Sequence, residues 1–137
     1  MSNLINMALS TIIKKYAEER KGLQLIANPF KNGMAGGRKV YISGAISDNT
    51  DTAQEEFDLA ETSLIHHGAR PISPMDVDLH IENSKYTDFM KVDIRLLVDC
   101  HFILMLDGWE DSFGACVELL VAIVCGIEVL TQGDLNG

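Results

Sequence analysis

The sequence contains no apolar run long enough to cross a membrane. Its longest run, residues 119–125, is far shorter than the roughly 18 residues that a membrane-spanning helix needs. The first residues, MSNLINMALS, lack the basic start of a secretory signal, and two lysines follow the apolar residues instead of preceding them. Cysteine is scarce, and Cys100, Cys116 and Cys125 have no metal-ligand spacing, which is typical of reduced thiols. We therefore expect a cytoplasmic protein.

Basic residues are also few. The chain has 11 Lys and Arg against 20 Asp and Glu, a net charge of −9 over 137 residues. Residues 1–38 carry six basic and two acidic residues (+4), whereas residues 39–137 carry five and eighteen (−13). A body this acidic repels a polyanion, so we expect no nucleic-acid partner. One small anionic ligand is not excluded, because a helix N-terminus can bind a phosphate without Lys or Arg.

Glycine-rich phosphate-binding motifs are absent. The segment SGAISDNT has one glycine where a dinucleotide fingerprint needs G-x-G-x-x-G, and no G-x-x-x-x-G-K-[ST] occurs. The serine of SFGACVE does not lie in a G-x-S-x-G elbow. These absences weigh against NAD-type, P-loop and serine-hydrolase functions.

The first 38 residues differ from the rest. Apolar residues recur at helical spacing opposite Lys14, Lys15, Glu18 and Glu19, which predicts an amphipathic helix that ends before Gly22. The turn-rich segment NPFKNGMAGGR then predicts a linker. We favour docking of this helix on its own acidic body or on a second subunit over a membrane surface.

From residue 39 onward, strands and helices alternate. The pattern predicts, in order, a strand KVYISG, a helix over 51–67 stopped by Gly68, a strand ARPIS, a helix over 84–98, a buried strand HFILML, a helix containing Glu118, and a strand IEVL. This order predicts a doubly wound α/β domain over 39–137, a Rossmann-like or flavodoxin-like parallel sheet with helices on both faces. Ligands bind such sheets outside the carboxyl ends of the strands.

Glu118 stands out because the rest of its helix is almost entirely small or apolar. Its neighbours one turn away, Gly114, Ala115, Val121 and Ala122, include no opposite charge. The helix dipole would favour the ionised carboxylate and burial would oppose it. A carboxylate held in this way suits attack on an anomeric carbon. The alternative, with equal weight on spacing alone, is that Glu118 faces solvent.

Other chemistry-bearing residues have plainer alternatives. Asp93 also lies in an apolar-patterned helix, although a solvated carboxylate paired with Lys91 or Arg95 is the favoured interpretation from spacing alone. Ser112 is expected to cap the Glu118 helix. Trp109 either stacks on a base or covers a core edge. The segment DVDLH alternates like metal ligands, but its loop-like sequence weighs against a metal site.

Taken together, YISGAI, DIRLLVDC and LDGWEDSFGACVELLVA resemble the nucleoside 2-deoxyribosyltransferase-like superfamily. The resemblance covers about residues 39–130 and is greatest to a small phage and bacterial branch with a GWExSxGAxxE motif, related to the 2′-deoxynucleoside 5′-monophosphate N-glycosidases. It implies cleavage or transfer at the N-glycosidic bond of a 2′-deoxynucleoside or its monophosphate. It also implies that no cofactor or metal is needed, and that the enzyme is a homodimer or higher homo-oligomer with a small-molecule substrate.

The same resemblance implies roles for individual residues. Glu118 matches the nucleophile, Asp93 the acid that assists departure of the base, and Tyr41 the tyrosine that orients the glutamate. The residues expected to contact the substrate are Gly44, which lets the first loop approach it, Ser112, which matches a phosphate-binding serine, and Asp107, Trp109 and Gly114.

A rival interpretation is a binding protein of the same fold, which captures a nucleotide or nucleotide-derived signal without turnover. Tyr41, Asp93, Ser112 and Glu118 favour the enzyme. His101, where the family usually has Asp, and the acidic first loop AISDNT favour the binding protein.

Overall fold

A computed structural model describes residues 36–46, 50–76 and 85–136, together with residues 7, 9, 11, 12, 14 and 15. The strands are β1 (Lys39–Ser43), β2 (Arg70–Ile72), β3 (Phe102–Met105) and β4 (Glu128–Thr131), the helices are α2 (Thr50–His66), α3 (Tyr86–Val98), α4 (Phe113–Val124) and α5 (Gln132–Asn136), and two short 3-10 turns are η1 (Pro74–Asp76) and η2 (Trp109–Asp111).

The four strands form one parallel sheet in the order β2-β1-β3-β4. The predicted doubly wound α/β class is therefore confirmed, and β3 is the buried inner strand that its continuous apolar sequence predicts. The chain leaves β1 toward β2 on one side and returns to β3 on the other. This change of direction opens a crevice between the carboxyl ends of β1 and β3, where Ser43 pairs in register with Met105.

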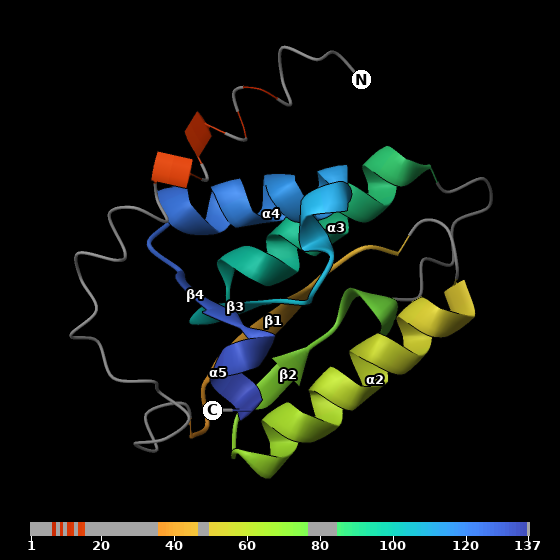
Figure 1. Ribbon diagram of the computed structural model, residues 1–137, viewed down its shortest axis with the longest axis vertical. Coiled ribbons are helices and arrows are strands. Elements are labelled where there is room, and N and C mark those ends of the chain that lie inside the picture. The colour runs from red at the N-terminus through yellow and green to blue at the C-terminus, as the bar shows by residue number, and fades with distance from the viewer. Residues whose placement is uncertain are drawn as a thin grey trace.

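Helices cover both faces of the sheet, with α2 below it and α3 and α4 above it in the view of Figure 1. The period-two alternation of β1 sends its side chains to two separate clusters. Val40 and Ile42 pack with Phe57 and Leu64 of α2, whereas Tyr41 packs on the opposite face with the core of α3 and α4. Side chains of β1 therefore contribute to the hydrophobic core on both faces of the sheet.

The predicted stop of α2 is also confirmed. Gly68 has φ 82°, a left-handed conformation that glycine adopts without steric cost, and α2 ends at His66 just before it. The chain can then turn directly into β2.

The predicted N-terminal helix is not confirmed. The six described residues of this segment have helical conformation, and Leu9 is buried while Met7 is exposed. The other residues of the predicted helix, and the predicted linker as far as residue 35, lie outside the described residues. The division into segments 1–38 and 39–137 therefore stays a prediction.

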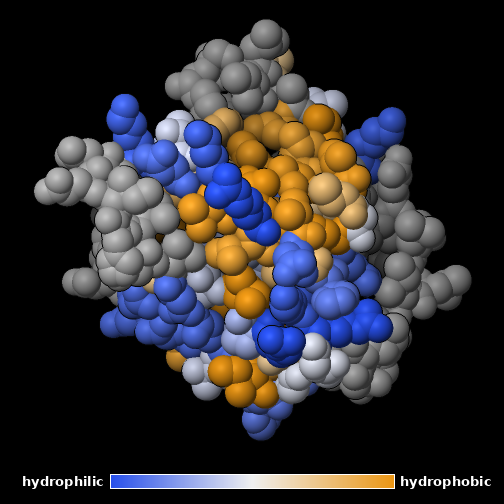
Figure 2. Space-filling view, turned by 180° about the vertical axis from the view of Figure 1, so that it is seen from behind, coloured by the Kyte–Doolittle hydropathy of each residue, from blue (hydrophilic) through white to orange (hydrophobic). Residues whose placement is uncertain are grey.

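No helix among the described residues is both long and apolar enough to span a membrane. Apolar side chains nevertheless gather on the surface seen in Figure 2. The exposed large apolar residues include Tyr86, Phe89 and Val98 on α3 and Val124 on α4. Such groupings are typical of surfaces that another molecule covers. The homo-oligomer implied by the resemblance stays a prediction.

Two leucines of α2 provide a matched test of this packing. Leu64 is 0% exposed and Leu59 is 71% exposed. We expect Leu64→Ala to lower the free energy of unfolding by about 3 kcal/mol, because it leaves a cavity in the core. Leu59→Ala should change it by less than about 0.5 kcal/mol. Urea denaturation would measure both, and equal losses would contradict the proposed packing of α2.

Candidate active site

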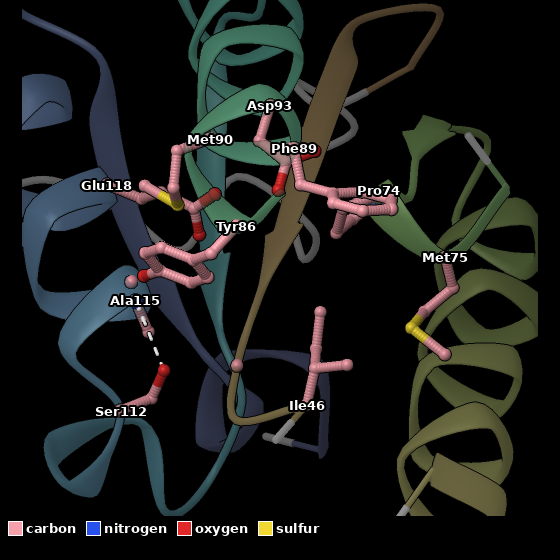
Figure 3. Close-up of a pocket in the computed structure, with 12 residues that line it drawn as sticks. Ile46, Pro74, Met75, Tyr86, Phe89, Met90, Asp93, Ser112, Ala115 and Glu118 are labelled. Atoms are coloured by element: carbon pink, nitrogen blue, oxygen red, sulfur yellow. Dashed lines mark hydrogen bonds between the residues drawn. The ribbon is translucent and has the colours of Figure 1, made fainter. Parts of the chain in front are cut away.

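A cavity of about 370 Å³ lies at the carboxyl edge of the sheet, between the end of β1, α3, η1 and the start of α4 (Figure 3). Its volume lies within the range of small-molecule sites. The described residues that line it are Gly44, Ile46, Pro74, Met75, Tyr86, Phe89, Met90, Asp93, Ser112, Gly114, Ala115 and Glu118. The sequence predicts eight residues at the site. Five of them line this cavity, and Tyr41 donates a hydrogen bond to one of these five, Glu118.

Glu118 is held from the sheet side by two hydroxyl groups of β1. The Tyr41 hydroxyl donates to Glu118 Oε2 at 2.6 Å, and the Ser43 hydroxyl donates to Oε1 at 2.7 Å. Glu118 is 4% exposed and Tyr41 and Ser43 are 0% exposed. Charge-assisted hydrogen bonds of this length fix both carboxylate oxygens. The alternative that placed Glu118 in solvent is wrong.

Burial dominates the electrostatics of Glu118. Desolvation raises the pKa of its carboxyl group to about 7, although the hydrogen bonds from Tyr41 and Ser43 lower the pKa and the charge of Asp93 raises it further. Burial and the nearby Glu118 charge raise the pKa of Tyr41, so its phenol keeps its proton and donates it. Glu118 can therefore exchange a proton near neutral pH.

Asp93 reaches the same cavity from α3. It is 8% exposed, and burial raises the pKa of its carboxyl group to about 6. No ion pair or hydrogen bond joins Asp93 to another described residue, so the expected pairing with Lys91 or Arg95 is wrong. Two acids from different helices thus share one largely apolar cavity, an arrangement typical of acid–base sites.

Ser112 caps α4 as predicted, because its hydroxyl oxygen accepts from the Ala115 N–H at 3.2 Å. Gly44 lines the cavity, and a Cβ on it would lie 3.1 Å from the Leu106 side chain. The absence of a side chain therefore lets the first loop lie close against Leu106.

Two expected substrate-binding residues do not line the cavity. Asp107 is exposed, and its backbone N–H donates to Gln132 Oε1 at 2.6 Å. Trp109 is half-buried and packs against the core of α3 and α4, as the core-edge interpretation predicts. Their assignment to substrate binding stays a prediction.

Several residues that line the cavity, or that contact Glu118, were not predicted from the sequence. Ser43 was detectable, because a strand side chain two residues after Tyr41 lies on the same face. Tyr86, Phe89 and Met90 were also detectable, since they share the helical face of Asp93 at spacings of seven, four and three residues. Met75 and Pro74 follow β2 in a short turn that no regular spacing indicates.

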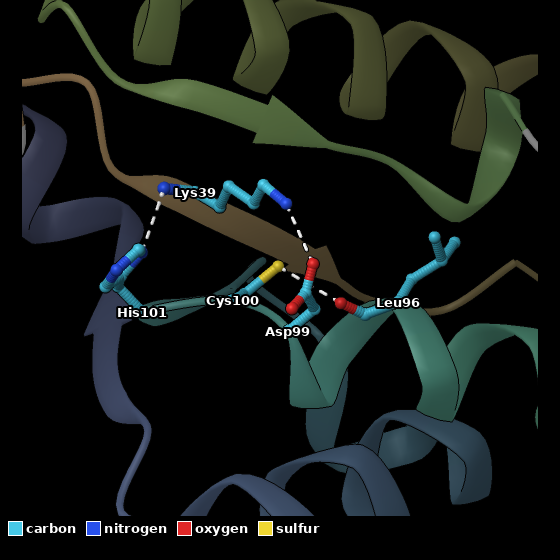
Figure 4. Close-up of polar contacts among 5 residues, drawn as sticks. All are labelled: Lys39, Leu96, Asp99, Cys100 and His101. Atoms are coloured by element: carbon cyan, nitrogen blue, oxygen red, sulfur yellow. Dashed lines mark hydrogen bonds and ion pairs between the residues drawn. The ribbon is translucent and has the colours of Figure 1, made fainter.

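His101 lies at the opposite edge of the sheet. The backbone N–H of Lys39 donates to His101 Nδ1 at 3.3 Å, and Lys39 Nζ forms an ion pair with Asp99 Oδ2 at 2.8 Å (Figure 4). These contacts join the amino ends of β1 and β3, whereas the cavity lies at their carboxyl ends. His101 therefore gives no support to the binding-protein interpretation.

No group of three or more potential ligands that could hold a metal occurs among the described residues. Asp76 is described and exposed, whereas Asp78 and His80 lie outside the described residues. The expectation that neither metal nor cofactor is needed stays a prediction.

Comparisons with known proteins agree with the fold. Residues 38–131 match the model of the family described as "Domain of unknown function (DUF4406)". A 2-deoxyribosyltransferase from Bacillus psychrosaccharolyticus is similar in structure, with TM-score 0.56 and 21% identity over 68% of this chain and 70% of that chain. A 2-deoxyribosyltransferase from Leishmania mexicana has TM-score 0.54 and 18% identity over 69% of this chain and 63% of its own. No curated protein matches the chain. At these identities the similarity establishes the fold alone.

The raised pKa of Glu118 has a measurable effect on stability. Because its pKa in the folded protein (about 7) exceeds the ordinary 4.5, the folded state binds this proton more tightly, and its contribution to stability falls as pH rises from 4.5 to 7. Relative to the unmodified protein, Glu118→Gln should therefore gain about 3 kcal/mol in free energy of unfolding between pH 4.5 and pH 8.

Urea denaturation at the two pH values would measure this gain. The exposed Glu55→Gln on α2 controls for the loss of one negative charge. An equal pH dependence in both variants would contradict the assigned burial of Glu118.

Proposed function

The chain belongs to the DUF4406 family and has the fold of the 2-deoxyribosyltransferases, and on that premise we propose that it cleaves or transfers the N-glycosidic bond of a 2′-deoxynucleoside or its 5′-monophosphate. One observation carries the proposal: Glu118 is buried at the cavity, oriented by Tyr41 and Ser43, and shares that cavity with the protonatable Asp93.

Glu118 acts as the nucleophile. Its ionised carboxylate attacks C1′ of the deoxyribose while the bond from C1′ to the base nitrogen breaks, through a transition state with oxocarbenium character. Tyr41 and Ser43 donate to its two oxygens and so restrict the rotation of the carboxylate. The product of this step is a glycosyl ester of Glu118.

Asp93 moves the proton. Its neutral carboxyl group donates a proton to the departing base, which leaves as a neutral molecule. Water or a second base then attacks C1′ and breaks the ester bond, while ionised Asp93 accepts the proton that the attacking molecule loses. Both carboxyl groups return to their starting states, so the cycle needs no other reactant.

The apolar lining supports this chemistry. Phe89 of α3 supplies an aromatic ring to the lining of the cavity, and Met90 and Ile46 add apolar surface. Aromatic side chains stack favourably on nucleobases. An apolar wall also excludes water, which strengthens the attraction between the carboxylate and a cationic transition state.

The direct test is base release. Purified protein incubated with deoxynucleosides and their 5′-monophosphates, with and without an acceptor base, should release or exchange a base that chromatography detects. Glu118→Ala should lower the rate by at least about 10³-fold, because it removes the nucleophile. Glu110→Ala, which removes an exposed carboxylate that does not line the cavity, should retain activity.

Two outcomes would count against the enzyme. Base release that persists in Glu118→Ala at the unmodified rate would exclude Glu118 as nucleophile. Tight retention of a nucleotide with no base released from any substrate would instead favour the binding protein.

The pKa values also predict the pH dependence. Activity requires that Glu118 is ionised, so the rate should rise as the pH passes the pKa of Glu118, about 7. Activity also requires that Asp93 is neutral, so the rate should fall as the pH passes the pKa of Asp93, about 6. We therefore expect a bell-shaped kcat/KM profile with its maximum between pH 6 and 7. Asp93→Asn should lower kcat by roughly 10²-fold and flatten the alkaline limb. A rate that rises steadily from pH 5 to pH 9 would contradict these roles.

A further inference from the structure

We propose that Tyr86 makes this site selective for deoxynucleosides with a free 5′-hydroxyl and excludes their 5′-monophosphates. The inference rests on the proposed function and names the residue that sets its substrate class. It comes from the position of the Tyr86 side chain, which the assigned chemistry does not use.

Tyr86 is the first residue of α3 and reaches across the cavity to the start of α4. The backbone N–H of Lys85 donates to Asp88 Oδ2 at 2.9 Å, which fixes the first turn of α3. A Cβ added to Gly114 would lie 2.8 Å from Tyr86 Oη, so the phenol occupies the space that any larger residue at Gly114 would fill. Figure 3 shows the Tyr86 ring between Glu118 and Ser112.

The start of α4 offers hydrogen-bond donors of the kind that a phosphate accepts from. The backbone N–H groups of Phe113 and Gly114 donate to no other described residue, and the Ser112 hydroxyl lies beside them. Unpaired N–H groups and the positive end of the helix dipole attract anions. The Tyr86 hydroxyl occupies the cavity side of this turn, beside Gly114, so a phosphate reaching it from the cavity meets the phenol.

Charge acts in the same direction. No Lys or Arg is present among the described residues that line the cavity. The segments that follow the first three strands in the sequence, residues 44–49, 73–84 and 106–112, contain no Lys or Arg and seven Asp or Glu. A phosphate dianion in the cavity would be repelled by the ionised form of Glu118, and no Lys or Arg of the described lining would compensate, because the exposed Lys85 next to Tyr86 does not line the cavity.

An uncharged 5′-hydroxyl suits the same position. No hydrogen bond joins the Tyr86 hydroxyl to another described residue, so it is available to a substrate hydroxyl. Burial, together with the nearby charges of Glu118 and Asp93, raises the pKa of Tyr86, which keeps the phenol neutral. A neutral phenol can both donate and accept a hydrogen bond.

Binding tests this role separately from turnover. In the Glu118→Gln background, calorimetry would compare deoxyadenosine and thymidine with their 5′-monophosphates. The protein with Tyr86 should bind at least one nucleoside more tightly than its monophosphate. Tyr86→Ala should reduce the ratio of the two dissociation constants at least about tenfold, chiefly by tighter monophosphate binding. Tyr86→Phe, which removes only the hydroxyl, should reduce the ratio less.

The controls make the result specific to the cavity. Tyr86 is 58% exposed, so Tyr86→Ala should fold normally, and Val98→Ala changes a 50% exposed residue of the same helix outside the cavity lining. Val98→Ala should leave the ratio unchanged. An unchanged ratio in Tyr86→Ala, equal binding of both ligands by the protein with Tyr86, or no binding of either would overturn the inference.

Base release by the unmodified protein separates this inference from the proposed function. Release of base together with an unchanged ratio would refute the role of Tyr86 alone. A ratio that depends on Tyr86 without any release would support the selectivity and refute the glycosidic chemistry.

Discussion

Two hydrogen bonds from β1 to Glu118 connect the sheet to the helix that carries the candidate nucleophile, and the arrangement of the site depends on them. A carboxylate in an apolar layer is costly without donors, and Tyr41 and Ser43 supply one donor to each oxygen. Because side chains alternate along a strand, the two donors lie on the same face, directly under α4. The pair therefore fixes the orientation of Glu118.

The two faces of the sheet differ in chemistry: one packs only apolar side chains, and the other binds the buried carboxylate of Glu118. Toward α2, β1 presents Val40 and Ile42 to a cluster that consists entirely of apolar side chains. Toward α3 and α4, it presents Tyr41 and Ser43 to a buried acid. The apolar face contributes stability that offsets the destabilising carboxylate on the other face. Sites of this kind commonly depend on a rigid scaffold elsewhere in the fold.

Much of the fold follows from the sequence, because apolar periodicity and turn residues are local signals. The alternation of strands and helices, the stop at Gly68 and the cap at Ser112 are all of this kind. The environment of an acid is not local. Spacing alone could not decide between burial and solvent for Glu118, and it favoured the wrong environment for Asp93, because burial depends on which helix faces pack together.

The resemblance to a known family added residue roles, but only the fold shows which residues share a cavity. His101 departs from the family pattern close in sequence to β3, yet it lies at the far edge of the sheet. Trp109 belongs to the same motif as Glu118, and it packs on the core instead of lining the cavity. Nearness in sequence or membership of a motif therefore does not by itself place a residue in the cavity.

The separation along the chain between Tyr41 and Glu118, 77 residues, has a consequence for the order of assembly. During synthesis, β1 emerges long before α4, and it cannot complete its pairing until β3 arrives from the other side of the sheet. Contacts between such distant segments form slowly, because closing a long loop is entropically unfavourable. The nascent chain therefore has no partial site: the carboxylate acquires its two donors only when nearly the whole domain has been made.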